Sequence, residues 1–451
     1  MEKKINLGTD KVNKIFWQYA LPSIIAMLAQ TTAGAIDSIF IGRYVGPEGL
    51  SAITLFFPFL MLLIGLGSMF AIGSSTLAGI ELGKDNFEKS NNYFNLAFWV
   101  LGLFSITTSI IILTSLGFIS SALTSGITQT YIKDYGGIIS IFIVFFMLNF
   151  VMSFFLKLDG KPGKVVKIML SGTIINIILD YIFIAWLKMD LVGAALATGL
   201  SQLIPFSLFL YLLIRESNWT IKGPIIRLKE IWAIVFNGSS ELLSTTAHAL
   251  AGFVFNIIIL REIGVLGVAA YAVTMQIGSI AVSIGYGFGE ANQSALSFNM
   301  GAKNYDRVIQ FRRLTLIATL AAGFLIFLFT NSLGHLAAHV FVKDAQTIAL
   351  ASDILKYYSF AFIITGANIS MSTYYTAVND PILSGGLAFY RSFIGLMIGI
   401  LVFPIIIGPS GIWYAVIFAE ASSFIAGIYL YNQRPFGLKS SKQDLRPVGA
   451  S

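Results

Sequence analysis

The sequence predicts an all-α integral membrane protein, in which twelve transmembrane helices form two six-helix bundles related by a pseudo-twofold axis. Three observations support this: an apolar composition, twelve apolar stretches long enough to cross a bilayer, and an internal repeat spanning six of them. Of the 451 residues, 56% are hydrophobic and 11% are charged, and the mean hydropathy is +0.80. A soluble domain carries about 25% charged residues. The composition therefore excludes a soluble enzyme, a nucleic-acid-binding domain and a disordered chain.

Each transmembrane helix needs about 20 mostly apolar residues. The stretches that meet this requirement are 15–42, 50–80, 92–116, 131–156, 164–187, 191–214, 230–260, 265–297, 309–333, 350–378, 383–407 and 411–431. The segment 115–130 is apolar but short, and we interpret it as an outer loop or an interfacial segment. The first stretch is not a signal peptide, because it follows a charged segment and contains Pro22 and Asp37.

The distribution of lysine and arginine predicts the orientation, because cytoplasmic loops carry an excess of both. With the N-terminus in the cytoplasm, 22 of these residues fall inside and 6 outside, while Arg391 falls near the inner end of the eleventh stretch. We therefore expect a multi-pass protein of the cell (cytoplasmic) membrane with both termini cytoplasmic. The expected parts are an N-lobe at 1–215, a cytoplasmic linker at 216–229, a C-lobe at 230–433 and a polar cytoplasmic tail at 434–451.

Four loop motifs recur at a nearly constant distance. The motifs beginning at Gly46, Gly83 and Gly193 resemble those beginning at Gly264, Gly301 and Gly411, each 218 positions later. The fourth pair, Gly160-Lys-Pro162 and Asn379-Asp-Pro381, is separated by 219 positions. Because this offset spans an even number of helices, both halves enter the membrane in the same direction, and an axis along the membrane normal relates them. Two such bundles suit a rocking transporter with a central cleft.

The first half carries polar side chains within its apolar stretches. A charge at the bilayer centre costs about 2.5–3.5 kcal/mol on insertion scales, so each one needs a reason. Asp37 lies in the first stretch, and Asn176 and Asp180, four residues apart, share one face of the fifth. Thr198 in the sixth stretch adds a hydroxyl. These groups could ligate a hard cation such as Na⁺, or the carboxylates could share a proton because close carboxylates repel each other. Alternatively, the two residues have structural roles. Asp37 would then be solvated near the end of its helix, and Asp180 would cap a helix or pair with a nearby group.

The second half lacks this cluster. The four positions found 218 residues later are apolar, namely Phe255, Ile394, Ile398 and Val416. A structural feature of a duplicated fold would more often appear twice, so the asymmetry favours a functional site in the first bundle. Pro22 is placed to let the first helix bend, since proline removes a backbone hydrogen bond. The alternatives for Pro22 are a static kink and a helix start.

A different set of polar residues lies in the second half. Glu241 and His248 are seven residues apart on one helical face, where they could bind a cationic substrate or a proton. The alternatives are a buried ion pair of Arg391 with Glu420 or Glu241, and an interior histidine with its hydrogen bonds satisfied. Other polar groups here either line a cavity or join helices: Gln276, Gln293 and Asn368.

The inventory of reactive residues narrows the chemistry further. Cysteine is absent, which excludes disulfides and thiolate metal sites, and three histidines are too few for a histidine-built metal centre. No GxxxxGK[ST] phosphate loop occurs. We therefore expect no cofactor and no nucleotide, and expect an ion gradient or passive transport.

In their order and spacing, these motifs resemble the multidrug and toxic compound extrusion (MATE) family, in its bacterial DinF/MepA-like branch, over nearly the whole chain. The motifs that carry the resemblance are Leu21-Pro22 with Gln30 and Asp37, Phe40-Ile-Gly42, Gly46-Pro-Glu-Gly-Leu-Ser-Ala52, Gly160-Lys-Pro162, Asn176 with Asp180, Gly193-Ala-Ala-Leu-Ala-Thr198, Asn237-Gly-Ser-Ser-Glu241, Ala269-Ala-Tyr271 and Asn299-Met-Gly-Ala302. The resemblance implies a MATE/MOP-type fold with a V-shaped cleft. It also implies secondary active multidrug export, in which amphipathic and often cationic organic compounds are antiported against H⁺ or Na⁺ by alternating access.

The resemblance further implies roles for individual residues. The family's N-lobe cation site corresponds to Asp37, Asn176, Asp180 and Thr198, which are also the only expected ligands of a bound Na⁺. Pro22 corresponds to the family's bend in helix 1, Tyr135 to an N-lobe tyrosine, and Gln30 to a cavity residue. The chain departs from NorM-like members, whose second-lobe acids lie deep in helices 7 and 10.

That departure concerns two positions of the second lobe. Glu241 lies earlier in its helix than the NorM-like acid, and helix 10 offers Asn368 where an acid would be expected. A C-lobe ion site is therefore not implied.

Three other functions were weighed against a drug/cation antiporter. A flippase or exporter of lipid-linked, peptide or anionic substrates belongs to the same superfamily, but the first-lobe acids and twelve spans argue against it. A membrane-embedded transferase would need clustered DxxD-type acids at a membrane face, so no enzyme is expected. A channel would need a repeated pore motif. The expected partners are small amphipathic molecules and membrane lipid, without nucleic acid, and the expected state is a monomer.

Overall fold

The computed structural model describes residues 5–342 and 344–438, and within them the regular structure is entirely helical. In chain order the helices are α1 (Val12–Tyr44), α2 (Pro47–Gly83), α3 (Phe87–Leu123), α4 (Ile127–Leu158), α5 (Pro162–Asp180), η1 (Tyr181–Trp186), α6 (Asp190–Glu216), α7 (Leu228–Glu262), α8 (Val265–Gly301), α9 (Tyr305–Phe341), α10 (Ala345–Ala377), α11 (Pro381–Phe389), η2 (Tyr390–Ile394), α12 (Gly395–Ile407), η3 (Pro409–Trp413) and α13 (Tyr414–Gln433). In this described part of the chain, twelve continuous segments are long and apolar enough to cross a membrane. The predicted fold class is therefore confirmed.

One prediction about a loop was wrong. The segment 115–130 is not a loop, because α3 continues to Leu123 and α4 begins at Ile127. Leu116 and Ser120, one turn apart, are both buried, so the packed face of α3 extends beyond the bilayer-spanning length. Of the expected tail at 434–451, residues 439–451 lie outside the described residues. Phe436 is buried and packs its ring 4.7 Å from that of Tyr305.

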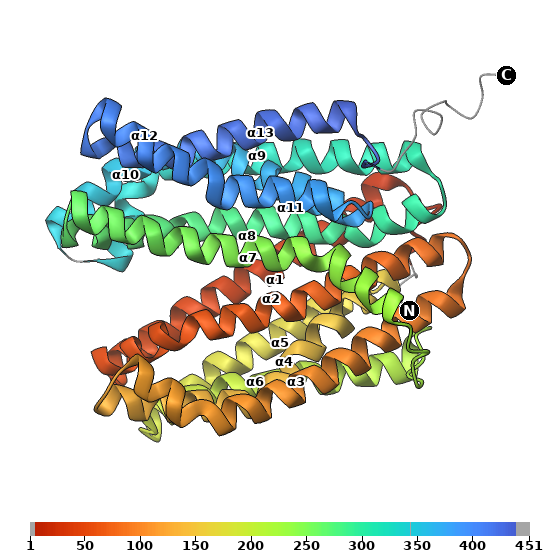
Figure 1. Ribbon diagram of the computed structural model, residues 1–451, viewed down its shortest axis with the longest axis horizontal. Helices are drawn as coiled ribbons and strands as arrows, with labels where there is room; N and C mark the ends of the chain where they lie inside the picture. The colour runs from red at the N-terminus through yellow and green to blue at the C-terminus, as the bar shows by residue number, and fades with distance from the viewer. Residues whose placement is uncertain (1–4, 343, 439–451) are drawn as a thin grey trace.

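The helices form two groups that lie side by side (Figure 1). Helices α1 to α6 make the first group and α7 to α13 the second, and each group packs mainly within itself. Between the groups, α2 packs against α7 and α8, and α1 packs along α8. The groups are called the first lobe and the second lobe below. Both ends of the described chain lie at one end of the molecule, which we call the termini side; the opposite end is the far side.

The internal repeat is visible in the backbone. Helices α2 and α8 both have 37 residues, as do α3 and α9, and each pair starts 218 positions apart. The turn residues repeat as well, because Gly46 has a φ of 102° and Gly264 one of 90°. Gly160 and Asn379 also share the left-handed region, with φ values of 80° and 64°. Glycine and asparagine tolerate this conformation better than other residues, so the recurring loop motifs mark recurring turns.

The lobes contact each other through glycines, with little side chain between the helices. A Cβ atom at Gly73 of α2 would overlap the carbonyl of Ile234 in α7, and one at Gly238 would overlap that of Met69 in α2. At the end of α2, Gly83 lies equally close to the Phe298 carbonyl of α8. Such small-residue interfaces bring helix backbones close and gain van der Waals contact where lipid supplies no hydrophobic driving force.

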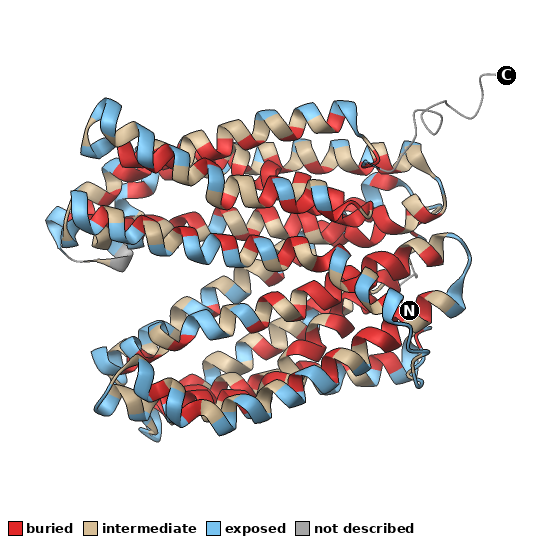
Figure 2. Ribbon diagram, in the orientation of Figure 1, coloured by how far each residue is buried: buried red, intermediate tan, exposed pale blue. Residues whose placement is uncertain are grey.

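All of these close contacts lie toward the termini side. Figure 2 shows buried residues concentrated there, whereas the far-side halves of the helices carry more exposed ones. The exposed residues include Ile39 of α1, Phe57 of α2 and Phe253 of α7. The lobes therefore touch on the termini side and part toward the far side.

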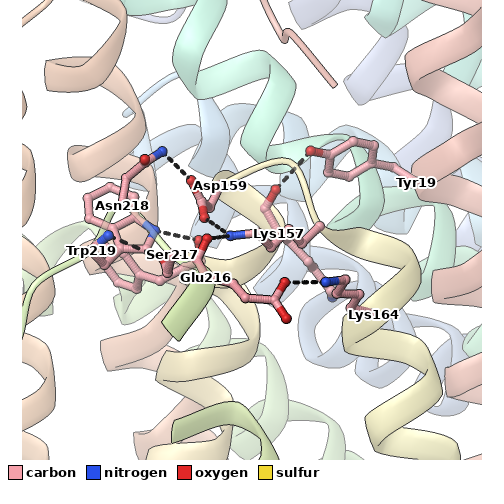
Figure 3. A network of polar contacts seen from close by, with 10 residues as sticks. Tyr19, Lys157, Asp159, Lys164, Glu216, Ser217, Asn218 and Trp219 are labelled. Carbon is pink, nitrogen blue, oxygen red and sulfur yellow. Dashed lines mark hydrogen bonds and ion pairs between the residues drawn. The ribbon is translucent and has the colours of Figure 1, made fainter. Parts of the chain in front are cut away.

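The connection between the lobes is fixed to the first lobe. Asparagine side chains of α3 bind its backbone, with Asn91 accepting from the Thr220 amide (2.9 Å) and Asn95 from the Lys222 amide (2.7 Å). Trp219 is buried and its indole donates to the Phe155 carbonyl at 2.8 Å. Around it, Lys164 pairs with Glu216 and Asn218 donates to Asp159 (Figure 3).

Gly238→Ala tests the backbone contact between the lobes. The added methyl overlaps the Met69 carbonyl, so we expect about 1–3 kcal/mol of destabilisation of the far-side-open state. Spin labels at Glu88→Cys and Asp306→Cys, on the first turns of α3 and α9, would report a longer termini-side distance, in a chain that has no native cysteine. Gly252→Ala on the same helix is the matched control, since nothing lies within 4 Å of its added Cβ. Equal distances in the two variants would contradict the interpretation.

Candidate cation and substrate site

A cavity of about 630 Å³ lies inside the first lobe, between α1, α2, α4, α5 and α6. Its walls include five of the residues singled out from the sequence: Gln30, Asp37, Tyr135, Asn176 and Thr198. These residues come from four helices and span 169 positions of the chain. The fold thus brings together most of the predicted first-lobe group.

The two acidic residues of this group are poorly satisfied by the protein. Asp180 is fully buried, and neither of its carboxylate oxygens has a hydrogen-bond partner among the described residues. Oδ1 of Asp37 is also buried and without such a partner in this part of the chain. The two carboxylates interact electrostatically with each other, and both interact with the Tyr135 hydroxyl. A buried carboxylate without a partner is costly, and a bound cation or proton would reduce that cost.

Asp180 occupies an irregular point of its helix. The α-helix α5 ends there and continues directly as the π-helical segment η1. Short π-helical segments widen the helix by one residue and frequently occur at functional sites. Asn176 lies one turn earlier and lines the cavity, whereas Asp180 lies behind the lining residues. The cation site would therefore extend from the cavity wall into the packed lobe.

The remaining wall is mostly aromatic and thioether. Phenylalanines and methionines from four helices line it: Phe57, Met61, Phe142, Phe146, Met147, Phe150, Met169 and Phe209. Methionine adapts to ligands of varied shape, and aromatic faces attract cations. Among the described lining residues, Asp37 is the one charged side chain and none is basic. The cavity is chemically suited to a bulky, apolar molecule with a positive charge.

Sequence reasoning missed an amide pair in this cavity. The Asn149 amide of α4 donates to the Gln202 side chain at 3.2 Å and to its carbonyl at 3.0 Å, joining α4 to α6. Asn149 Oδ1 is buried and has no hydrogen-bond partner within the described chain. Both residues are amides inside apolar stretches, and that signal could have identified them as it did Asn176. They add two further amide groups to the cavity wall.

Helix α1 connects the cavity to the other lobe. Pro22 lies inside this continuous helix. Two residues later, the Ile24 backbone would clash with a Cβ on Gly287 of α8. The Thr31 hydroxyl, which lines the cavity, lies 2.6 Å from that of Ser283 in α8. Movement of α1 near Pro22 would therefore alter both the cavity of the first lobe and the contacts of α1 with α8 in the second lobe.

The position in the second lobe that is equivalent to Asp37 is packed. Phe255, the counterpart of Asp37, is fully buried, with its ring centroid 4.8 Å from that of Tyr271 and 6.4 Å from that of Trp413. Ile394 and Ile398 are exposed. The asymmetry seen in the sequence thus corresponds to a difference in structure. Asp37 borders a cavity in the first lobe, whereas aromatic rings fill the position of Phe255 in the second lobe.

The polar residues of the second lobe lie outside this cavity. Arg391 donates to Glu420 at 3.0 Å, which confirms one of the two ion-pair alternatives. The Asn368 amide donates to the other carboxylate oxygen of Glu420 at 2.5 Å, so Asn368 belongs to this buried network. Glu241 is buried, His248 is exposed and Gln276 is partly exposed. No member of this group lines the cavity of the first lobe.

Comparison with known proteins supplies the family. The family model described as MatE matches residues 22–182 and 240–405, which is most of the chain. The chain belongs to the MATE family. It is therefore a membrane transporter rather than an enzyme, as predicted. The two matched ranges fall in the first and second lobes, as expected for a duplicated fold.

Named relatives agree with this assignment. The chain is 27% identical to "Multidrug export protein MepA" of Staphylococcus haemolyticus, over 79% of each chain. It is 24% identical to the MepA protein of Staphylococcus saprophyticus, over 94% of this chain and 95% of that one.

Solved structures share the fold. A MATE family transporter described in its outward-facing conformation superposes with a TM-score of 0.91 at 21% identity, covering 96% of this chain and 98% of that chain. A transporter of the MOP superfamily from Pyrococcus furiosus, described as having a binding pocket of reverse polarity, gives a TM-score of 0.88 at 21% identity, covering 98% and 100%. These similarities establish the fold.

Asp180→Asn tests whether this carboxylate is held under strain for an ion. Removing a buried, unpartnered charge should keep the protein folded and raise the Tm of the ion-free protein by about 2–4 °C, the shift that a change of ~1 kcal/mol in unfolding free energy gives in a larger domain. Wild-type Tm should also rise with Na⁺ or with acid, and that dependence should be lost in Asp180→Asn. A lower Tm with unchanged ion dependence would make Asp180 structural. Asp353→Asn, at an exposed carboxylate of α10, is the control.

Proposed function

We propose that the chain is a secondary active multidrug exporter, which expels amphipathic organic cations in exchange for inward movement of H⁺ or Na⁺. The observation that carries this proposal is the 630 Å³ cavity, with aromatic and methionine walls and Asp37 as the charged group among the described residues that line it. The names of the MepA relatives support the same substrate class.

Coupling is proposed to occur at Asp37 and Asp180. A bound cation would relieve their repulsion, and Asn176 and Thr198, which line the same cavity, would add oxygen ligands. A proton would need the carboxylates alone, whereas Na⁺ would also need the amide and the hydroxyl, because hard cations take several oxygen ligands. Loss of activity in Asn176→Ala and Thr198→Ala would therefore favour Na⁺.

Transport is proposed to follow alternating access. With the termini side in the cytoplasm, as the lysine and arginine distribution predicts, the far side is outside and the present conformation is outward-open. Ion uptake from outside bends α1 near Pro22, the cavity contracts and the organic cation leaves. The loaded carrier then opens on the termini side, where it releases the ion and binds new substrate. The chain is proposed to act as a monomer.

The alternative of a lipid-linked or anionic substrate is disfavoured by the wall of the cavity. An anionic substrate would require basic side chains, and the described lining residues include none. Export of anionic or lipid-linked compounds, without export of organic cations, would reverse this preference.

Asp37→Asn should abolish coupled export without preventing folding, because it removes the charge that attracts both the ion and the substrate. The measurement is efflux of ethidium from energised cells that lack their own pumps. Asp353→Asn should leave efflux unchanged, since the Asp353 side chain is exposed and pairs with Lys356. Gradient-dependent efflux by Asp37→Asn at the wild-type rate would refute the assignment. Varying Na⁺ and pH separately identifies the ion.

Pro22→Ala should slow turnover more than it weakens binding. Restoring the backbone hydrogen bond that proline lacks stiffens α1, so the movement of the helix becomes harder while the cavity keeps its lining. We expect a lower kcat for efflux with a substrate Kd within about threefold of wild type. Pro404→Ala, at an interior proline of α12 in the second lobe, is the matched variant. Equal rates in both variants would remove Pro22 from the mechanism.

A further inference from the structure

A buried ion pair crosses the boundary between the lobes on the termini side. Lys157, at the end of α4 in the first lobe, places its ammonium 3.6 Å from the carboxylate of Glu290 in α8 of the second lobe. The two side chains are only 4% and 15% exposed. The backbone of Lys157 is held in place, because the Tyr19 hydroxyl donates to its carbonyl at 2.8 Å (Figure 3). Breaking a buried pair by separating its partners is costly unless each finds a new one.

A second glutamate of the second lobe shares this location. Glu241 of α7 is buried and repels Glu290 electrostatically. Among the described residues, no hydrogen bond or ion pair engages its carboxylate. Glu241 lies 13 residues and Glu290 11 residues from the termini-side ends of their helices, so both are roughly 17–20 Å inside the helix ends at 1.5 Å per residue. The second lobe thus carries two acidic groups at one depth, and the first lobe supplies one cation to them.

The contacts between the lobes seal this group from the termini side. Gly238, one turn before Glu241, touches the Met69 backbone of α2. Beyond Glu290, toward the end of α8, Ser297 would meet a Cβ on Gly79 of α2, and Phe298 one on Gly83. When these contacts open, the carboxylates become reachable from the termini side, and Lys157 moves away with the first lobe.

The other charged groups nearby do not replace Lys157. Arg391 interacts with Tyr286 but is held by Glu420 at 3.0 Å, and His248 faces Arg391 electrostatically. The Tyr286 hydroxyl interacts electrostatically with both glutamates. Once Lys157 has left, two carboxylates and an aromatic ring would remain without a cation of their own.

We propose that Glu241 and Glu290 form a capture site for an organic cation, which Lys157 occupies as a tethered surrogate whenever the lobes are closed on the termini side. Two carboxylates beside a tyrosine ring suit a lipophilic ammonium or phosphonium better than a hard divalent metal ion, which needs about six oxygen ligands. This proposal rests on the proposed function, because it assumes that the lobes alternate between two openings.

The replacement of Lys157 by the substrate, and of the substrate by Lys157, sets the order of steps in the proposed cycle. A substrate that enters from the termini side neutralises the glutamates and holds the lobes open there. Return of Lys157 expels the substrate from this site toward the cavity of the first lobe and closes the termini side. Substrate and Lys157 compete for the same carboxylates. The apparent affinity for the organic cation is therefore proportional to the fraction of molecules in which Lys157 has left the site.

The test measures equilibrium binding of radiolabelled tetraphenylphosphonium to the purified full chain in lipid nanodiscs. Lys157→Gln removes the competitor and should tighten binding by roughly tenfold. Adding Glu241→Gln and Glu290→Gln to that variant should remove the gain. Lys164→Gln is the matched control, because Lys164 pairs with Glu216 inside the first lobe on the same side of the molecule. Binding by Lys157→Gln no tighter than by Lys164→Gln, or a gain that survives loss of both glutamates, would overturn the proposal.

A second variant covers the case in which Lys157→Gln does not fold. Glu241→Gln keeps the pair of Lys157 with Glu290 intact and should weaken phosphonium binding severalfold, whereas unchanged binding would overturn the proposal. Asp37→Asn separates the two hypotheses. Wild-type efflux by Asp37→Asn would refute the proposed coupling site. The Lys157 and Glu241 variants would still test the capture site independently. An effect of Asp37→Asn alone would retain the proposed function and discard the capture site.

Discussion

The direct backbone contact of α2 with α7 and α8 is the constraint on which the rest of the structure depends. Lipid gives helices little reason to associate, so close van der Waals approach at small residues is a main contribution to holding two lobes together in a membrane. Here the glycines that provide such contact, including Gly73, Gly238 and Gly83, lie toward the termini side. The far-side halves of the same helices have no comparable contact across the boundary among the described residues, and their exposed side chains follow from that.

The two lobes show how a duplicated backbone can carry different chemistry. Helix lengths, offsets and left-handed turns are repeated almost position by position, because turn geometry depends on a few loop residues such as Gly46 and Gly264. The side chains between the turns are free to differ. Asp37 borders a cavity, while its counterpart Phe255 fills the equivalent space with aromatic contacts. The Arg391–Glu420 pair is a further feature of the second lobe alone, and it ties η2 to α13.

Much of the fold was predictable because hydropathy and charge are one-dimensional signals. The twelve spans, the repeat and the rarity of intramembrane charges are all legible in a single sequence. The first-lobe cluster was found for that reason, since Asp37 and Asp180 stand out against apolar neighbours. The segment 115–130, interpreted as an outer loop or an interfacial segment, is largely helical because α3 continues to Leu123, and hydropathy does not report where packing continues.

Contacts between helices could not be read from the sequence in the same way. Lys157 directly follows the predicted stretch 131–156 and is one of the 22 basic residues assigned to the inside, although its ammonium is buried against the other lobe. Glu241 and His248 lie seven residues apart on α7, as predicted, but Glu241 is buried and His248 is exposed. The amide pair of Asn149 and Gln202 depended on the approach of α4 to α6. Each case required knowledge of which surfaces meet.

Helix α1 takes part in both of the structural elements on which the proposed exchange depends. On one side of Pro22 lies the segment pressed against α8 through Ile24 and Gly287, and farther along the same helix Asp37 faces the cavity. Helix α1 therefore packs against the second lobe and also forms part of the wall of the cavity in the first lobe. Bending of α1 would therefore change the shape of the cavity and the packing between the lobes together. In the proposed exchange cycle this linkage would favour tight coupling, because the contact between the lobes and the cavity wall share one helix.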